Sequence, residues 1–277
     1  MSVSVIIPTH NRLEHLARAI YFLNKWQTHR DFEVIISDDN SSDDILSLYE
    51  RIKHRYDFEI KLTSYKNKGA PHIFQLSKAR NAGIKMASKE ILLIMDCDRI
   101  LSAKYIYTGL RIIRYFGKKC AVGGRTAYLN SYPQNIRNNI TEDELVKPPN
   151  LKQYDPVSNL FRPDVNIITK HNWSNLYGGG VMIPREFCNS FNGFDESYMG
   201  WGAEDLDFAR RIRRNGGEVL FAPIMDMYHM NHDYYHEEYN LDAFEEYYGK
   251  KPYDFTQENN ARYFGSMTDE ERENNRS

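Results

Sequence analysis

The first hundred residues alternate between short apolar runs and amphipathic stretches, and this alternation limits the possible folds more than any other feature of the chain. The apolar runs cover residues 2–7, 32–36, 58–63 and 91–95 and have the length of strands. Helical patterns lie between them, over residues 13–26, 44–56 and 76–87. Strands that alternate with helices at this spacing pair in parallel through right-handed crossovers. The sequence therefore predicts an α/β fold with a Rossmann-like, mainly parallel central sheet and flanking helices.

Polar residues follow three of the predicted strands at the point where each strand ends. Thr9 follows the first strand, Asp38 and Asp39 follow the second, and Asp96 follows the fourth. The carboxyl ends of parallel strands meet at one edge of the sheet, where open α/β sheets bind their ligands. We therefore expect these four side chains to lie close together, although they are far apart in the sequence.

Asp96 and Asp98 follow the run Ile-Leu-Leu-Ile-Met, which reads as a strand buried on both faces. Two carboxylates one residue apart repel each other unless a cation lies between them, and a divalent ion that carries a diphosphate fits this role. The alternative is a polar strand end whose aspartate caps the next turn. Cys97 is expected to point back into the sheet rather than to bind the ion, because alternate strand residues face opposite ways.

The composition excludes several classes of protein. The 277 residues, of which 41% are hydrophobic, can bury a substantial core, and the net charge of −2 gives no reason to expect nucleic acid as a partner. Three scattered cysteines suit a reducing compartment better than a disulfide framework, and no apolar run approaches the ~20 residues that span a bilayer. We expect a cytoplasmic protein. Peripheral contact with a membrane surface and the oligomeric state stay open.

The periodicity changes after the first half, which suggests three segments. We expect one subdomain over residues 1–125 and a second over residues 126–233. Within the second segment, residues 130–173 are rich in Asn and Pro, have little periodicity and are expected to form a mobile loop that becomes ordered on a substrate; plain disorder is the alternative. Residues 234–277 form an aromatic and acidic tail.

Several motifs, in their order along the chain, together resemble known glycosyltransferases. In the first half, Pro8-Thr9-His10-Asn11-Arg12, Asp38-Asp39-Asn40-Ser41, Ala79-Arg80-Asn81-Ala82-Gly83 and Asp96-Cys97-Asp98 resemble the nucleotide-sugar-binding half of family-2 glycosyltransferases with the GT-A fold. In the second half, the Gly178-Gly179-Gly180 run and the segment 192–207 resemble the acceptor-side part of galactosyl- and N-acetylgalactosaminyltransferases, including chondroitin-synthase-like domains.

The resemblance implies a metal-dependent hexosyltransferase. Such an enzyme moves a hexose or an N-acetylhexosamine from a UDP-sugar to a hydroxyl of a saccharide or glycoconjugate acceptor, here with inversion, in surface polysaccharide or glycan biosynthesis. The resemblance makes residues 1–125 the nucleotide-sugar-binding subdomain and residues 126–233 the acceptor-binding, catalytic subdomain, with the 130–173 loop facing the acceptor. Mn²⁺ or Mg²⁺ is the implied cofactor. The donor sugar, the acceptor and the linkage do not follow from the sequence.

The resemblance also assigns residues to the donor and the metal ion. The expected nucleotide contacts are Pro8, Thr9, Asn11, Arg12, Asp38, Asp39, Arg80 and Asp96. Arg80 could pair with the diphosphate or orient an aspartate of the metal motif; a surface ion pair is the alternative. Asp98 is the expected direct metal ligand, with Asp96 on the ribose or on metal-bound water. A third ligand is expected from His229, with His232 as the alternate.

Glu204 and Asp205 are the candidate catalytic residues. An inverting transfer needs a carboxylate that takes the proton from the acceptor hydroxyl, and Asp205 aligns with the base of inverting galactosyltransferases. Trp201, Gly179 and Gly180 are the expected acceptor-binding residues. Ala203 departs from the family pattern, in which glycine is commoner. The plainer interpretation of Glu204 and Asp205, as first-turn acids of a helix over 206–214, is compatible with catalysis.

Two rival functions fit the sequence less well. A nucleotidyltransferase that makes sugar nucleotides would need a glycine-rich, basic phosphate loop after the first strand, and Pro-Thr-His-Asn-Arg is not such a loop. A non-catalytic sugar-binding protein on the same fold would not need Asp96, Asp98, Asp205 and His229 together. Release of UDP from a UDP-sugar would separate these alternatives.

Overall fold

The computed structural model describes residues 1–64, 74–128, 169–170, 179–198 and 204–230. Its strands are β1 (Val3–Thr9), β2 (Phe32–Asp38), β3 (Ile60–Ser64), β4 (Ile91–Met95), β5 (Arg99–Leu101), β6 (Cys120–Tyr128), β7 (Thr169–Lys170), β8 (Gly180–Pro184) and β9 (Glu218–His229). Its helices are α1 (Leu13–Trp26), α2 (Ile45–Ile52), α3 (Leu76–Met86), α4 (Tyr105–Phe116), α7 (Arg185–Ser190) and α8 (Glu204–Arg214). Trp201, His232, most of the 130–173 segment and the 234–277 tail lie outside the described residues.

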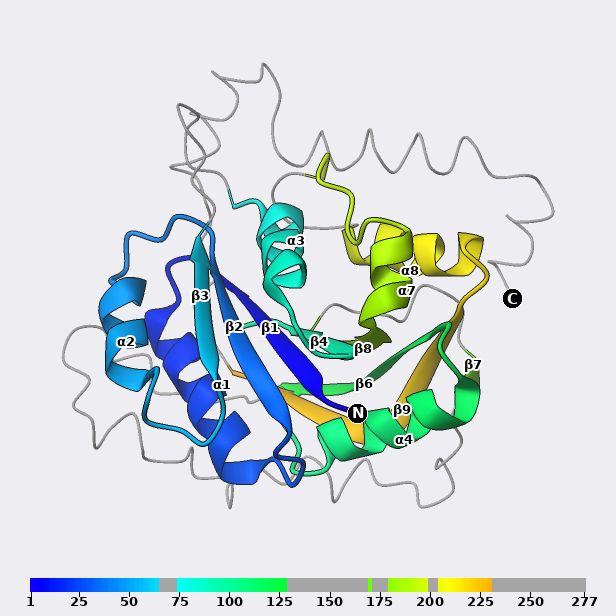
Figure 1. The fold of residues 1–277 in the computed structure, drawn as a ribbon, viewed down its shortest axis with the longest axis horizontal. Coiled ribbons are helices and arrows are strands. Elements are labelled where there is room, and N and C mark those ends of the chain that lie inside the picture. Colours follow the sequence, from blue (N-terminus) through cyan, green and yellow to red (C-terminus); the bar gives the residue numbers. More distant parts are fainter. Residues whose placement is uncertain (65–73, 129–168, 171–178, 199–203, 231–277) are drawn as a thin grey trace.

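One continuous sheet organises the described residues, with the strand order β3-β2-β1-β4-β8-β6-β9-β5 and β7 paired to β9 (Figure 1). The strands β3, β2, β1 and β4 pair in parallel, as the alternation of strand and helix predicts. β8 then pairs antiparallel to both β4 and β6, and β6 pairs in parallel with β9. The predicted α/β fold is confirmed, and the parallel pairing is confined to the first four strands and to β6 with β9.

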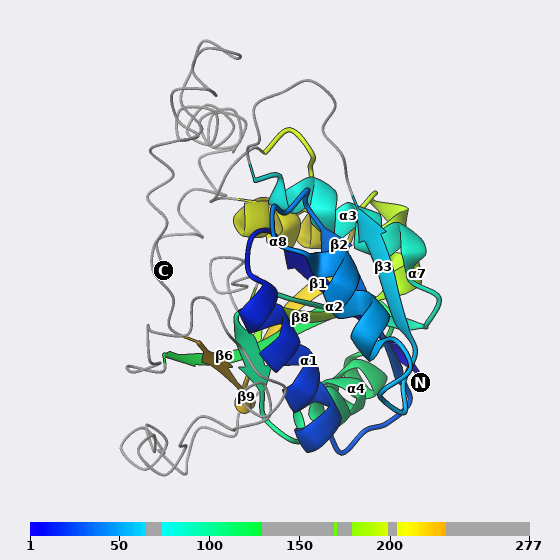
Figure 2. The ribbon, with the colours of Figure 1, turned by 90° about the vertical axis from the view of Figure 1, so that its left-hand side faces the viewer.

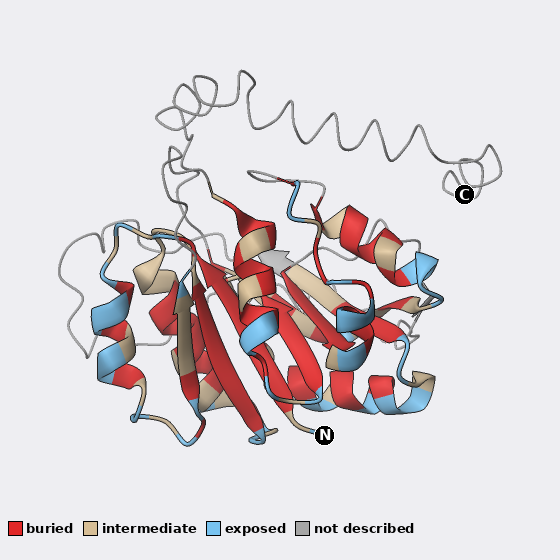
Figure 3. Cartoon of the chain, turned by 45° about the horizontal axis from the view of Figure 1, so that its top comes forward, coloured by how far each residue is buried: buried red, intermediate tan, exposed pale blue. Residues whose placement is uncertain are grey.

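Helices cover both faces of the sheet (Figures 1 and 2). One face carries Val5, Ile7 and Leu93 and packs against α1, α2 and α4. The other face carries Ile6 and Ile94 and packs against α3, α7 and α8. Successive strand residues point to opposite faces, so a run that is apolar throughout is needed wherever both faces are covered. Figure 3 shows the resulting buried strands between the helix layers.

The predicted strand 91–95 is β4, and each of its five residues is buried. Helix α3 packs closely against the sheet. A Cβ atom on Gly83 would lie 2.4 Å from Ile6 Cγ2, so the missing side chain lets α3 approach β1 more closely than another residue would allow. This approach sets the position of Arg80, which lies on the same helix one turn earlier.

Two predicted helices differ from the structure at their ends. The helix predicted over 44–56 ends at Ile52, after a start at which the Asp44 side chain accepts a hydrogen bond from Ser47 N at 2.9 Å. α8 begins at Glu204, two residues before the predicted start. The three cysteines are buried and unpaired. No helix in the described ranges combines the length and the apolar character that crossing a membrane requires.

Candidate active site

The carboxyl ends of β1 and β2 lie side by side, as predicted. Thr9 pairs with Asp38 in the parallel register, and Asp39 N donates a hydrogen bond to Thr9 O at 2.9 Å. The Asp39 side chain is 1% exposed, and its Oδ2 accepts a hydrogen bond from Gln75 N at 2.5 Å. Asp39 therefore links the end of β2 to the start of α3, at the edge where the nucleotide is expected.

The other residues assigned to the nucleotide lie in the loops at this edge. Asp38 accepts a hydrogen bond from Ser41 N at 3.1 Å, so it closes a turn. Asn11 has a positive φ of 49°, and its Oδ1 accepts from Ser42 N at 2.6 Å. Asn11 thus ties the loop after β1 to the loop after β2. Pro8 belongs to β1, and Arg12 directly precedes α1.

Arg80 brings the two halves of the predicted site together. Its side chain is 1% exposed, so it is not the surface ion pair that the sequence left open. Nη2 lies 3.1 Å from Asp96 Oδ1, whereas Nη1 lies 2.8 Å from Asp205 Oδ1 and 3.2 Å from Glu204 Oε1. One guanidinium therefore contacts the first carboxylate of the Asp96–Asp98 motif and both candidate catalytic acids.

Phe194 and Asn81 support this guanidinium. Arg80 Cζ lies 4.8 Å from the centroid of the Phe194 ring, and that ring stacks on Phe208 of α8 at 4.0 Å. Asn81 accepts a hydrogen bond from Phe194 N at 3.0 Å and donates one to Phe194 O at 2.9 Å. Phe194 was not predicted as a site residue. The available signal was an aromatic residue within the 192–207 segment.

Glu204 and Asp205 are adjacent but have different surroundings. The side chain of Glu204 is 5% exposed and that of Asp205 is 23% exposed. Burial and, to a lesser extent, the Asp205 charge raise the pKa of Glu204 to about 7, against the opposing effect of Arg80. Asp205 is therefore the acid that an incoming hydroxyl group can reach more easily.

The second carboxylate of the motif lies beside a histidine, as predicted. Asp98 Oδ2 is 3.6 Å from His229 Nε2, and Met230 N donates a hydrogen bond to Asp98 O at 2.8 Å. β5 and β9 pair antiparallel with Arg99 opposite His229, which brings these groups together from distant parts of the chain. Cys97, between the two aspartates, is buried in the core on the α1 side.

The described side chains do not form a complete metal site by themselves, but they fit an ion that is bound together with a diphosphate. In the described ranges no group of three or more His, Cys, Asp or Glu side chains could hold a metal ion. Asp98 and His229 offer two donors at a separation that one ion could bridge. Mg²⁺ is usually bound through one or two carboxylates together with substrate phosphates, so these residues fit an ion that arrives with a diphosphate.

Gly179 and Gly180, predicted to bind the acceptor, pack against neighbouring side chains. A Cβ atom on Gly179 would lie 2.7 Å from Arg99 Nε. Tyr105 Oη donates a hydrogen bond to Gly180 O at 2.6 Å. A Cβ atom on Gly180 would lie 2.9 Å from Tyr105 Oη. Arg99 was not singled out from the sequence, although it directly follows Asp98. The role of the two glycines toward an acceptor stays a prediction.

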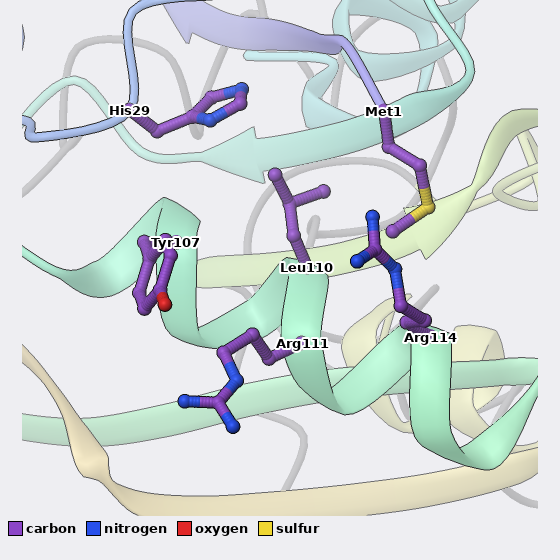
Figure 4. Close-up of a pocket in the computed structure, with 6 residues that line it drawn as sticks. All are labelled: Met1, His29, Tyr107, Leu110, Arg111 and Arg114. Atoms are coloured by element: carbon purple, nitrogen blue, oxygen red, sulfur yellow. The ribbon is translucent and has the colours of Figure 1, made fainter.

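A pocket of about 230 Å³ lies at the opposite edge of the sheet (Figure 4). Met1, which precedes β1, and His29, which precedes β2, line it together with Tyr107, Leu110, Arg111 and Arg114 of α4. It contains none of the predicted site residues. The candidate site is therefore defined by its converging charged side chains rather than by this pocket.

The chain matches two models of protein families. The model described as glycosyl transferase family 2 matches residues 4–190. The model described as the N-terminal domain of galactosyltransferase matches residues 166–234. Together these matches include Arg80, Asp96, Asp98, Asp205 and His229.

Characterised relatives are similar over about three quarters of this chain. Hyaluronan synthase from Pasteurella multocida is 25% identical over 236 residues, which are 78% of this chain and 23% of that protein. Chondroitin synthase from the Pm70 strain of the same species is 26% identical over 238 residues, again 78% and 23%. Validoxylamine A glucosyltransferase from Streptomyces hygroscopicus subsp. jinggangensis is 27% identical, with 77% and 52% covered. The chain thus spans less than two thirds of the length of these relatives.

Solved structures share the fold. GalNAc-T7, crystallised with UDP, GalNAc and Mn²⁺, superposes with a TM-score of 0.63 at 19% identity and covers 83% of this chain and 44% of that one. Residues 1–349 of S. aureus TarS in complex with UDP-GlcNAc give a TM-score of 0.59 at 19% identity, with 85% and 60% covered. At this identity the similarity establishes the architecture of the sheet and its helices.

Proposed function

The chain belongs to glycosyl transferase family 2 and has the GT-A fold, and on this premise we propose that it transfers a sugar from a UDP-sugar donor to a saccharide or glycoconjugate acceptor. The donor sugar is proposed to be a hexose or an N-acetylhexosamine. The relatives include polysaccharide synthases, which favours a role in making a surface polysaccharide or a related glycan.

The observation that carries the proposal is the position of Arg80. This buried guanidinium contacts Asp96 on the donor side and Glu204 and Asp205 on the acceptor side. Ion pairs between arginine and carboxylates fix geometry as well as charge. A side chain that joins the end of β4 to the start of α8 would hold the catalytic acid at a fixed position relative to the donor diphosphate.

Asp205 is the proposed general base of an inverting transfer. It would accept the proton of the acceptor hydroxyl while that oxygen bonds to the anomeric carbon and the bond from this carbon to the phosphate oxygen breaks, releasing UDP. Glu204 is less suited to this role, because its side chain is 5% exposed whereas that of Asp205 is 23% exposed and is easier for a hydroxyl group to reach. Glu204 is instead proposed to position Arg80.

Asp98 and His229 are proposed to hold Mn²⁺ or Mg²⁺ together with the donor diphosphate, with Asp96 beside them. When bound, the ion would stabilise the negative charge that develops on the departing UDP. The structures of GalNAc-T7 with UDP and Mn²⁺ and of TarS with UDP-GlcNAc support a UDP-sugar donor and a metal ion for this chain. Thr9 and Asp39 are proposed to bind the nucleoside at the same edge.

Calorimetric titration of UDP with and without Mn²⁺ tests the proposal. We expect Mn²⁺ to tighten UDP binding, and we expect Asp98→Ala to remove most of this gain, because Asp98 is the proposed direct ligand. Asp57→Ala is the control, since Asp57 is 87% exposed and pairs with Arg30 away from the site. Equal UDP affinity in both conditions, or an unchanged Asp98→Ala variant, would contradict the metal-bridged site. A screen of UDP-sugars for UDP release then identifies the donor.

A further inference from the structure

Arg99 contacts both carboxylates of the Asp96–Asp98 motif. Its Nε lies 3.3 Å from Asp98 Oδ1, and its Nη2 lies 4.0 Å from Asp96 Oδ2. The side chain is 12% exposed. The motif that is proposed to bind a divalent ion therefore already has a cation of the protein beside it.

Gly179 leaves the space that this guanidinium occupies. A Cβ atom at position 179 would lie 2.7 Å from Arg99 Nε, 2.9 Å from Cζ and 3.2 Å from Nη2. Real Cβ atoms do not come as close as the first two distances, so any side chain at this position would require the guanidinium to shift from its place beside the aspartates. Antiparallel pairing of β5 with β9 fixes the Arg99 backbone opposite His229.

The guanidinium also has unused donors. Its Nη1, like the Nε beside Asp98, is buried and makes no hydrogen bond within the part of the chain that the structure describes. A buried donor without an acceptor is unfavourable, and arginine donors match phosphate oxygens well. Nε and Nη2 therefore lie beside the carboxylates, whereas Nη1 can donate a hydrogen bond to an anion.

We propose that Arg99 couples the binding of the divalent ion to the binding of the nucleotide. With no diphosphate present, its positive charge partly neutralises Asp96 and Asp98 and repels a second cation, so the ion alone binds weakly. A diphosphate brings negative charge that offsets this repulsion and an acceptor for Nη1. Ion and nucleotide then bind with positive coupling, which by linkage is the same in both directions. In this scheme, which rests on the function proposed above, Arg99 acts on the ion through its charge and on the diphosphate through Nη1.

The test is a titration of Mn²⁺ into the full chain, with and without saturating UDP, with free Mn²⁺ followed by electron paramagnetic resonance. Arg99→Met should tighten Mn²⁺ binding in the absence of UDP by roughly tenfold, because a charge a few ångströms from the ion is removed. The factor by which UDP improves Mn²⁺ affinity should fall correspondingly. Arg99→Lys keeps the charge and should remain closer to the wild type.

Two further variants keep the test decisive. Gly179→Ala retains the arginine but displaces it, so it should change Mn²⁺ binding in the same direction as Arg99→Met and by less. Arg125→Met removes another partly buried arginine, which is 28% exposed and pairs with Asp226 at 2.8 Å, and it should leave Mn²⁺ binding unchanged.

Nucleotide-free Mn²⁺ affinity that is unchanged or weaker in Arg99→Met, with intact coupling to UDP, would overturn the inference while leaving the glycosyltransferase proposal in place. A wild-type chain that binds no UDP with or without Mn²⁺ would instead defeat the proposed function. In that case the nucleotide-free titration still shows whether Arg99 opposes ion binding.

Discussion

Arg80 contacts three carboxylates, and the resulting imbalance of charge shapes the chemistry of the site. A single buried guanidinium neutralises one negative charge, so Asp96, Glu204 and Asp205 cannot all be ionised without repulsion. Burial raises the pKa of Glu204 to about 7, and burial also raises the pKa of Asp96. Displaced pKa values of this kind concentrate at functional sites, although structural ion pairs also produce them.

Asp205→Asn should lower the rate of sugar transfer about 10²–10⁴-fold, the usual effect of removing a general base. Ground-state binding of UDP should change little, because the amide keeps the size of the side chain. Steady-state kinetics and UDP calorimetry on the same preparation measure both quantities. Near-normal turnover in Asp205→Asn together with loss in Glu204→Gln would move the role to Glu204. A product that retains the anomeric configuration of the donor would exclude inversion.

Glu204 also predicts a pH dependence of stability. Its pKa is raised from 4.5 to about 7 in the folded protein, so the neutral acid is favoured on folding. The stability that this preference contributes is fully present below the unfolded pKa and is lost as the pH rises through about 7. Glu204→Gln should lack this loss. Urea unfolding of both proteins at about pH 5 and about pH 8 measures the difference.

The control for this measurement is Glu186→Gln, which changes an exposed acid in the first turn of α7. Glu186→Gln should follow the pH profile of the wild type. If Glu204→Gln also followed it, the buried acid would have the same pKa in the folded and unfolded chains, and its proposed environment would be wrong.

At the scale of elements, Glu33 joins the amino-terminal side of the parallel strands. Its side chain on β2 is 0% exposed, and Lys61 Nζ of β3 lies 2.7 Å from its Oε2. Ser4 of β1 donates to Oε1 at 2.6 Å, and Ser88 N donates to the same oxygen at 2.8 Å. Burial alone would raise the pKa of Glu33, but these partners outweigh it and lower the pKa to about 2.

Glu33→Gln should reduce the free energy of unfolding at neutral pH by about 2–3 kcal/mol. The depressed pKa gives the wild type a stability that is present above about 4.5 and is lost as the pH falls through about 2, so the two proteins should converge in acid. Urea unfolding across this range is the measurement. Glu59→Gln, which removes an exposed acid 3.5 Å from the same Lys61, should change stability far less. Equal effects of the two substitutions would contradict this account.

The parallel elements could be predicted because each carries its own local signal. The apolar run at 91–95 became β4, and the amphipathic pattern at 13–26 became α1 with the same limits. The position of β8 between β4 and β6 has no such local signal, because it depends on pairing between strands far apart in the chain. α2 ends four residues before the predicted end. The residues after Ile52 continue the amphipathic pattern in the sequence, but they are exposed or only partly buried, so packing does not stabilise a longer helix.

Some features of the candidate site could likewise be predicted from the sequence, and others could not. Asp96, Asp98, His229 and Asp205 could be predicted, because motif order places them near one edge, and the structure brings Asp98 to His229 and Asp96 to Arg80. Which partner Arg80 takes, and the presence of Arg99 against Gly179, depend on side-chain packing that no spacing encodes. Their roles in binding and catalysis stay predictions until they are measured.

At the scale of the whole molecule, the two proposed subdomains share one sheet. β8 and β9 come from the second segment, yet β8 pairs with β4 along its length and β9 pairs with both β5 and β6. The division at residue 125 stays a prediction about roles in binding. Arg80 and Asn81 of α3 add side-chain contacts from the first segment to the second, with Asp205 and Glu196. The donor and acceptor sides are therefore joined by strand pairing and also by contacts of the helix layer.

A fragment of residues 1–125 should therefore not fold into a native-like unit. Without β8, the backbone of β4 becomes an open sheet edge, and without α7 and α8 the apolar side chains of Leu92 and Ile94 lose Phe187 and Phe208 as neighbours. Exposed apolar edge strands associate with one another, so the fragment should self-associate and unfold without a cooperative transition. Sedimentation and urea unfolding followed by circular dichroism test this. A monomeric fragment with a sharp transition and retained UDP binding would show instead that the donor side is stable alone, and that the shared sheet serves to position the catalytic acids rather than to hold the fold together.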